Sequence, residues 1–187
     1  LLLYKKMVEQ GHKVTFLTFG GGEDLLYSDQ LSGINVMPIY CYYAKNKNKW
    51  INLFNSFLIP FHHNFKTLFK TADIYKTNQM SGSWIPLLAG KCFKKPVIVR
   101  CGFEMLRNLI RDEQNRLIRS IKAIFGYGLE LFAYASSDRI VSSNVSDRGF
   151  ILKYFPIKKD KIRLIRNFID TKLFSQQDMI HREEHKR

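Results

Sequence analysis

Cysteine and acidic residues are both scarce in this sequence. Its 187 residues include three cysteines, Cys41, Cys92 and Cys101, an odd number without the spacing of a disulfide framework. This excludes a disulfide-rich secreted scaffold and favours reduced thiols in the cytoplasm. A chain of this length buries roughly 70% of its unfolded surface, so it folds without such crosslinks.

Long apolar runs and targeting segments are also missing. No run approaches the ~20 apolar residues that span a bilayer, and the amino terminus lacks the three regions of a signal peptide. We therefore expect a protein that is soluble or lies on a membrane without crossing it. The first residues, "LLLYKKMVEQGH", have the pattern of the second half of a helix. This start indicates a fragment of a longer protein.

Basic residues outnumber acidic ones by 30 to 16, which gives a formal net charge of +14. A charge of this size favours anionic partners such as nucleic acid, acidic lipid headgroups or phosphorylated substrates. The basic residues are spread along the chain among apolar ones. The aromatic RNP motif of RNA-binding domains is absent, which makes RNA a less favoured partner.

Strand-like and helix-like segments alternate along the whole chain. β-Branched and apolar residues typical of strands occupy residues 13–19, 34–39, 73–78, 96–102, 139–144 and 161–168. Helical spacing occurs in residues 1–10, in 50–70 with a break near Pro60, in 83–93, in 104–135 with a break around Gly126–Gly128, and in a segment ending at Tyr154. The alternation predicts an α/β fold, a Rossmann-like parallel sheet flanked by helices.

Polar residues follow the predicted strands where each strand ends. In parallel α/β sheets, ligands bind outside the carboxyl ends of the strands. Polar residues also end strands for ordinary turn reasons, and the pattern alone leaves both interpretations open. The candidate cleft residues are Asn78, Gln79, Ser81, Gly82, Arg100, Gly102, Asn144 and Asn167.

Several short motifs occur in a characteristic order. They are "GHKVTFLT" (11–18), "ADIYKTN" (72–78), "KPVIV" (95–99), "ASSDRIVSS" (135–143) and "KIRLIRNFIDTKLF" (161–174). Together they resemble the amino-terminal domain of a GT-B-fold glycosyltransferase of family 4, whose members retain the anomeric configuration. The last motif is the most specific, because its Asn, Asp and Phe are all in register. "KTNQMSGSW" with "VRCGF" is similar to a bacterial and archaeal branch concerned with surface polysaccharides.

The resemblance implies a division of the chain and an activity for the whole protein. Residues 1–174 would form the acceptor-side domain, and residues 175–187 would begin a linker to an absent second domain. The full-length protein would be a hexosyltransferase-type enzyme that moves a sugar from a UDP- or GDP-sugar to a glycan or lipid-linked acceptor, with retention. No cofactor and no metal are implied. This fragment alone would be inactive, and the enzyme would be cytoplasmic or peripheral on the inner face of the cell membrane.

Two departures from the family pattern concern the site. Many relatives carry a His just after the "PVIV" strand, and that position is Gly102 here. Catalytic residues are therefore not assigned. The Asn-Gly pair of the last motif is Asn167-Phe168, so a glycine that eases the turn is missing. The competing hypothesis is a non-catalytic basic α/β module that binds acidic membrane or nucleic acid; the glycosyltransferase hypothesis implies no nucleic-acid partner.

Several individual residues and segments each allow two interpretations. Arg100 could bind an anionic acceptor group, or it could pair with a carboxylate such as Glu104. The stretch from Trp50 to Phe65 could rest on a membrane as an amphipathic surface, although we expect most of its aromatics to pack on the sheet. Arg107, Arg111 and Lys122 form either a basic binding face or a solvated helix face.

For three further features we favour a structural explanation over a functional one. "HREEH" (181–185) has the histidine spacing of some zinc sites but lacks a downstream third ligand, so we expect a solvated linker helix. The run Gly20–Gly22 lacks GxGxxG spacing and is weak support for phosphate binding. Cys101 is expected to be a small buried residue rather than a nucleophile.

Overall fold

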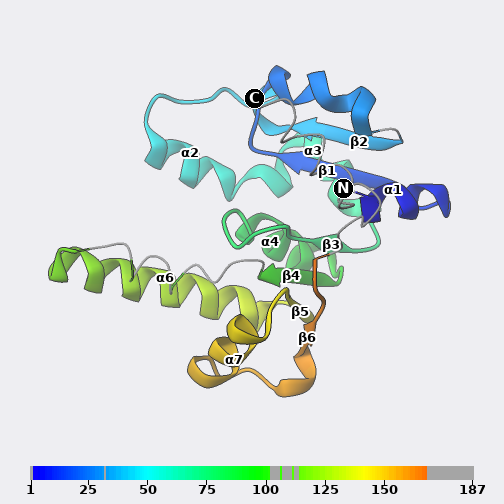
Figure 1. The fold of residues 1–187 in the computed structure, drawn as a ribbon. Helices are drawn as coiled ribbons and strands as arrows, with labels where there is room; N and C mark the ends of the chain where they lie inside the picture. The colour runs from blue at the N-terminus through cyan, green and yellow to red at the C-terminus, as the bar shows by residue number, and fades with distance from the viewer. Residues whose placement is uncertain (1, 32, 102–105, 107–110, 112–113, 168–187) are drawn as a thin grey trace, which may run out of the picture.

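The computed structural model describes residues 2–31, 33–101, 106, 111 and 114–167, and its strands form two parallel sheets (Figure 1). In the first sheet β1 (Val14–Thr18) pairs with β2 (Ile34–Pro38). The second sheet has the order β3-β4-β5-β6, formed by Tyr75–Lys76, Val97–Cys101, Arg139–Ser142 and Ile162–Leu164. The predicted α/β fold with parallel strands flanked by helices is confirmed.

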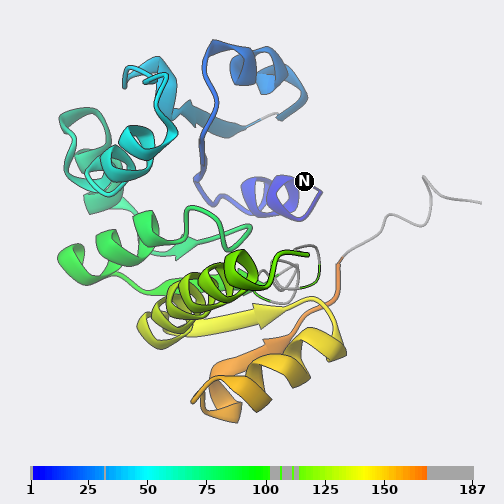
Figure 2. The same ribbon diagram turned by 90° about the vertical axis from the view of Figure 1, so that its left-hand side faces the viewer.

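Helices connect the strands in the predicted alternation. The α-helices are α1 (Leu2–Glu9), α2 (Lys49–Ser56), α3 (His63–Thr71), α4 (Trp84–Phe93), α6 (Arg116–Ser136) and α7 (Val145–Tyr154). The 3₁₀ helices are η1 (Gly22–Leu31), η2 (Ile39–Cys41), η3 (Ile59–Phe61) and η4 (Lys159–Lys161). Helices α4, α6 and α7 lie along the four-stranded sheet (Figure 2). No helix in the described ranges is both long and apolar enough to span a bilayer.

One continuous sheet was expected, and two sheets are found in the described part of the chain. The edges of β1 and β3 are not hydrogen-bonded to each other. Tyr4 of α1 links them instead. Its ring lies edge-on to Phe16 of β1 at 5.0 Å, and its hydroxyl oxygen accepts a hydrogen bond of 2.5 Å from Lys76 Nζ of β3.

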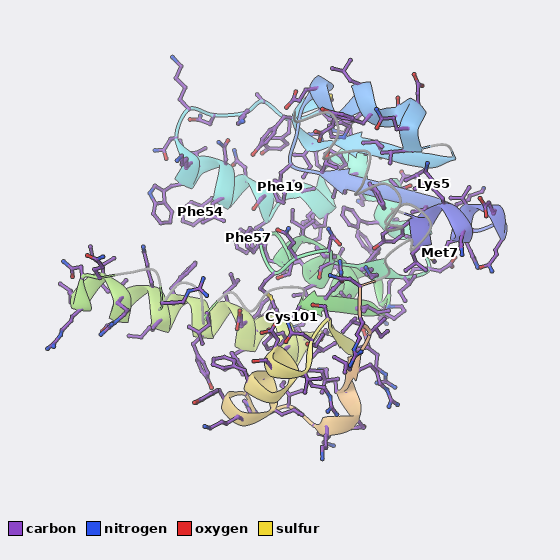
Figure 3. All side chains as sticks on the ribbon, viewed as in Figure 1. Lys5, Met7, Phe19, Phe54, Phe57 and Cys101 are labelled. Atoms are coloured by element: carbon purple, nitrogen blue, oxygen red, sulfur yellow. The ribbon has the colours of Figure 1, made fainter. Side chains whose placement is uncertain are left out.

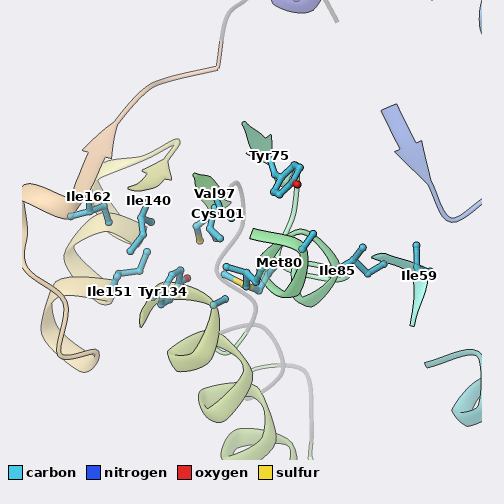
Figure 4. Close-up of a cluster of buried hydrophobic side chains, with 14 of the residues drawn as sticks. Ile59, Tyr75, Met80, Ile85, Val97, Cys101, Tyr134, Ile140, Ile151 and Ile162 are labelled. Carbon is cyan, nitrogen blue, oxygen red and sulfur yellow. The ribbon is translucent and has the colours of Figure 1, made fainter. Parts of the chain in front are cut away.

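The hydrophobic core lies along β4 and the elements beside it (Figure 4). Val97, Val99 and Cys101 are buried, whereas Ile98 and Arg100 between them are partly exposed. This alternation follows from the pleat, which sends successive side chains to opposite faces. The predicted role of Cys101 as a small buried residue is confirmed, and Arg100 points to the opposite face of the sheet.

Two residues of the quoted motifs hold the sheet together away from the site. Asp138 precedes β5, and its side-chain Oδ2 accepts a hydrogen bond of 2.7 Å from Val97 N, the first residue of β4. Lys161 Nζ donates to the Ala135 carbonyl oxygen at 2.9 Å, in the last turn of α6. Burial lowers the pKa of this lysine. The first interaction joins the starts of β4 and β5, and the second joins the start of β6 to the end of α6, so both residues have structural roles.

The predicted break around Gly126–Gly128 is wrong, because α6 continues through it from Arg116 to Ser136. Glycine costs a helix about 1 kcal/mol relative to alanine, and packing offsets this cost. Tyr127 stacks on Phe155 with ring centroids 4.9 Å apart, and its hydroxyl donates to the Tyr154 carbonyl oxygen at 3.3 Å. The predicted break near Pro60 is confirmed, since η3 separates α2 from α3.

The prediction that most aromatics between Trp50 and Phe65 pack on the sheet is also wrong. Phe65 is fully buried, but Trp50 and Phe54 are mostly exposed. Phe57 and Phe61 are exposed as well, although each lies against another aromatic ring. Helix α2 therefore carries an apolar surface that the described residues do not cover.

Tyr75→Phe is expected to lower the free energy of unfolding by about 1 kcal/mol at neutral pH. The buried Tyr75 hydroxyl donates to the Phe69 carbonyl oxygen, which loses its partner in the variant. Burial also raises the pKa of Tyr75. The folded protein then binds more protons than the unfolded chain above the ordinary tyrosine pKa of about 10, so this residue makes stability fall as pH rises through that range. Urea unfolding at several pH values would measure both effects. If the wild type and Tyr75→Phe lost the same free energy of unfolding at alkaline pH, the expected effect of the raised Tyr75 pKa would be contradicted.

Candidate functional site

Arg100 brings together three of the predicted cleft residues at the carboxyl ends of β3, β4 and β6. Its Nη1 donates to Asn78 Oδ1 at 2.8 Å, and its Nη2 donates to Asn167 Oδ1. Asn78 follows β3, Arg100 lies in β4 and Asn167 follows β6, so residues 67 positions apart in the sequence meet here. Parallel strands end at one edge of a sheet, which is why the sequence pattern predicted this meeting.

The backbone around Arg100 fixes this cluster. Thr77 N donates to the Ile98 carbonyl oxygen at 2.9 Å, which continues the pairing of β3 with β4 beyond Lys76. The Thr77 hydroxyl then accepts a hydrogen bond of 2.9 Å from Arg100 N. Similarly, Ile165 N donates to the Ser142 carbonyl oxygen at 2.9 Å, which extends the pairing of β6 with β5. Asn78 and Asn167 are thus held beside Arg100 by regular sheet geometry.

The cluster of Arg100, Asn78 and Asn167 presents hydrogen-bond donors and a positive charge to solvent. Each asparagine uses its Oδ1 to accept from Arg100, which turns its Nδ2 hydrogens away from the guanidinium. The two side chains that accept hydrogen bonds from the guanidinium within the described residues are neutral amides, so neither of them would repel an anionic ligand. Arg100 is half-buried, whereas Asn78 and Asn167 are exposed. Such an accessible set of N–H donors around one cation suits an anionic oxygen group such as phosphate or carboxylate.

The loop from β3 to α4 presents the other predicted residues at this edge. Thr77, Met80 and Ser83 are buried, and Ser83 N donates to the Met80 carbonyl oxygen at 3.0 Å. Gln79 and Ser81, between these anchors, are exposed together with Asn78. The inward residues fix the loop while the polar ones face solvent, an arrangement that suits hydrogen bonding to sugar hydroxyls.

Gly82 has a conformational role in the same loop. Its φ is +81°, a left-handed value that favours glycine, and an added Cβ would lie 2.5 Å from Phe19 Cε2. Phe19, which follows β1, is labelled in Figure 3. Gly82 therefore lets the end of β1 approach the loop of the candidate site.

Asn144 is placed differently from the other candidates, because its side chain caps helix α7. Its Oδ1 accepts from Asp147 N at 2.7 Å, and its Nδ2 donates to Asp147 Oδ2 at 2.6 Å. Asp147 is buried in the first turn of α7, so this pair of hydrogen bonds fixes Asn144 at the start of the helix. The structure thus gives Asn144 a capping role, and within the described residues no hydrogen bond joins it to Arg100.

The glycine run beyond β1 is surrounded by its own carboxylates. Gly21 N donates to Glu23 Oε1 at 3.0 Å, and the Thr18 hydroxyl donates to Asp24 Oδ2. A Cβ on Gly20 would lie 2.0 Å from Asp24 Oδ2, so a larger residue here would require the Asp24 side chain to move. Backbone hydrogen bonds lower the pKa of Glu23, which stays ionised at neutral pH. Two carboxylates beside the loop oppose phosphate binding there.

Some predicted residues lie outside the described residues. These are Gly102, Glu104, Arg107, residues 168–174 of the last motif and the histidines of 181–185. One contributor was missed as a candidate, although it lies in the quoted strand-end segment. Thr77 supports the Arg100 backbone through its hydroxyl. The sequence signal that could have identified Thr77 is a residue with a hydroxyl group directly after a strand.

The sequence matches the profile of glycosyltransferase family 4 over residues 1–173. The chain belongs to this family. A search of curated protein sequences found no match. Among solved structures, the chain is similar to HepE of Anabaena, crystallised in complex with UDP and glucose, with a TM-score of 0.55.

The likeness to HepE concerns the fold. The two sequences are 12% identical, and the match covers 91% of this chain. It covers 42% of the HepE chain, so this family member spans less than half the length of that structure. The match agrees with the parallel α/β architecture described above.

Proposed function

We propose that this chain is the acceptor-side domain of a glycosyltransferase that uses a UDP- or GDP-sugar donor and retains the anomeric configuration. Membership of family 4 and the fold shared with a protein crystallised with UDP and glucose support this proposal. In the proposed division, residues 1–174 form the acceptor-side domain and residues 175–187 lead to a second domain that binds most of the donor. The chain alone is then inactive.

The observation that carries the proposal is the cluster of Arg100, Asn78 and Asn167. Its guanidinium and amide hydrogens suit an anionic group on the acceptor, such as the phosphate of a lipid-linked sugar or the carboxylate of a uronic acid. Gln79 and Ser81 lie in the adjoining loop and would bind acceptor hydroxyls. An acceptor of this kind fits the synthesis of surface polysaccharide or glycolipid by a hexosyltransferase.

The proposed reaction is a group transfer in which one bond forms and one bond breaks. An acceptor hydroxyl oxygen forms the new bond to the anomeric carbon of the donor sugar, and the bond from that carbon to the diphosphate oxygen breaks. The hydroxyl proton leaves with the nucleotide diphosphate or to solvent. Arg100 would hold the acceptor so that its hydroxyl lies near the donor, which is a positioning contribution. The enzyme would act in the cytoplasm, at the inner face of the cell membrane.

A donor screen would test the proposed activity. The protein expressed from its complete reading frame is incubated with UDP- and GDP-hexoses and with lipid-linked or uronic-acid acceptors. We expect release of UDP or GDP that depends on the acceptor, and a product with retained configuration by NMR. Folded protein that neither binds nor consumes any nucleotide-sugar would contradict the proposal and favour the non-catalytic binding module.

A further inference from the structure

The amino-terminal half of α6 carries an apolar surface on its outer side. Five large apolar residues recur there at positions i, i+1, i+4, i+7 and i+8, which form one stripe on a helix. All five are exposed: Leu117, Ile118, Ile121, Ile124 and Phe125. In Figure 1 this half of α6 projects away from the four-stranded sheet.

This stripe lies opposite the side of α6 that faces the core. The buried residues of the helix are Gly126, Glu130, Ala133 and Tyr134. At about 100° per residue, the stripe and the buried side are centred roughly 170° apart around the helix. The helix therefore has an apolar side toward the protein and a second apolar side toward solvent. Packing within the described residues explains only the first.

Helix α2 and the turn after it repeat the same spacing. Trp50, Ile51, Phe54, Phe57 and Leu58 occupy positions i, i+1, i+4, i+7 and i+8, and all are exposed. Phe57 and Leu58 lie beyond the end of α2 but keep right-handed helical backbone angles, which continues the stripe. Phe54 and Phe57 are labelled in Figure 3.

The two helices that carry these stripes lie on the same side of the molecule. Helix α2 and the amino-terminal half of α6 are both on the left in Figure 1, and that side faces the viewer in Figure 2. Soluble proteins rarely expose large apolar patches unless these bind a partner or a membrane. We call the ten stripe residues the two-helix surface.

Basic residues accompany both stripes. Arg116, Arg119 and Lys122 are exposed on α6, and Lys45, Lys47 and Lys49 are exposed in and before α2. The sequences of the two helices contain one acidic residue, Glu130, and it is buried. The two-helix surface therefore combines apolar side chains with positive charge and exposes no carboxylate of its own helices.

We propose that the two-helix surface docks on an anionic lipid bilayer. Amphipathic helices with aromatic and aliphatic residues on one side and Lys or Arg beside them lie in the interface of such membranes. A second copy of the chain would bring the same positive charge, which opposes pairing through this surface. The docking does not depend on any step of the proposed transfer reaction, so each can fail without the other.

Vesicle flotation with matched variants would test this docking. The protein expressed from its complete reading frame is mixed with phosphatidylglycerol–phosphatidylcholine vesicles and, separately, with phosphatidylcholine vesicles. We expect flotation with the anionic vesicles and weaker flotation as salt rises. Ile124→Gln should lower the partition coefficient about tenfold, because a large aliphatic side chain leaves the apolar phase. Arg119→Gln should lower it about fivefold.

Leu26→Gln is the matched control for Ile124→Gln. Leu26 lies in η1 and is 78% exposed, and Ile124 is 75% exposed, so both substitutions change a solvent-facing aliphatic residue. The control should float like the wild type, and all three variants should keep its melting temperature. Absence of flotation at low salt, or equal losses in Ile124→Gln and Leu26→Gln, would overturn the proposal. So would a stable dimer that Ile124→Gln dissociates.

Discussion

Arg100→Gln is expected to raise the KM for an anionic acceptor about 100-fold, with little change in the KM for the nucleotide-sugar. Glutamine keeps an amide group near the guanidinium position but removes the charge and the two-pronged donor geometry. A hydrogen bond to a charged group contributes about 1.5–3 kcal/mol, which corresponds to roughly 10- to 150-fold in affinity. Arg100 also orients the amides of Asn78 and Asn167, so its loss releases both. Steady-state kinetics with the full-length protein would measure the change.

Two comparisons separate binding of an anion from a structural role of Arg100. Arg100→Lys keeps the charge but loses the planar fork, and we expect a KM about tenfold above the wild type. An acceptor without its anionic group should bind the wild type and Arg100→Gln equally. Equal losses with charged and uncharged acceptors would contradict anion binding, and a large fall in melting temperature would indicate a structural role instead.

Gly90→Ala is expected to lower the free energy of unfolding by about 2 kcal/mol, the cost typical of overpacking a core. Alanine normally stabilises a helix relative to glycine by about 1 kcal/mol, so the expected sign is reversed here. Gly90 is buried in the middle of α4. A Cβ at this position would lie 2.3 Å from Val97 Cγ2 and 3.0 Å from the Lys95 carbonyl oxygen. The absence of a side chain at Gly90 thus allows α4 to pack closely on β4.

Gly128→Ala is the matched control for Gly90→Ala. Gly128 is exposed in α6, and an added Cβ meets no atom within 4 Å. This variant should raise the free energy of unfolding by about 0.5–1 kcal/mol. Denaturant unfolding of both variants would test the difference in sign. Stabilisation by both substitutions would contradict the packing described at Gly90.

The local sequence pattern predicted the positions of the strands well, because each strand lies in a short segment of β-branched and apolar residues. The run "PVIVRC" became β4 with alternating burial, and all six predicted strands form parallel pairs. The division into two sheets was not predicted, since hydrogen bonding between strands depends on distant segments. The continuity of α6 through Gly126–Gly128 was missed for a related reason. Contacts of Tyr127 with α7 stabilise that turn, and no local propensity reveals them.

The candidate site was predicted in part. The rule that ligands bind at the carboxyl ends of parallel strands selected Asn78, Arg100 and Asn167, and the structure brings these three together. The same rule selected Asn144, which instead caps α7, because strand ends and helix starts favour the same residue types. The exposure of α2 was not predicted, since an apolar helix stripe has the same spacing whether it packs on a sheet or faces outward.

Binding of an anion at Arg100 can be measured directly by NMR. The full-length protein is labelled with ¹⁵N-arginine and titrated with a short-chain alkyl diphosphate as a probe for the acceptor. The Nε resonance of Arg100 is identified by its loss in Arg100→Gln. We predict that this resonance shifts saturably with the diphosphate and does not shift with the corresponding alcohol. An Arg100 resonance that stays unchanged at saturating diphosphate would contradict the assignment of this cluster as the acceptor's anion site.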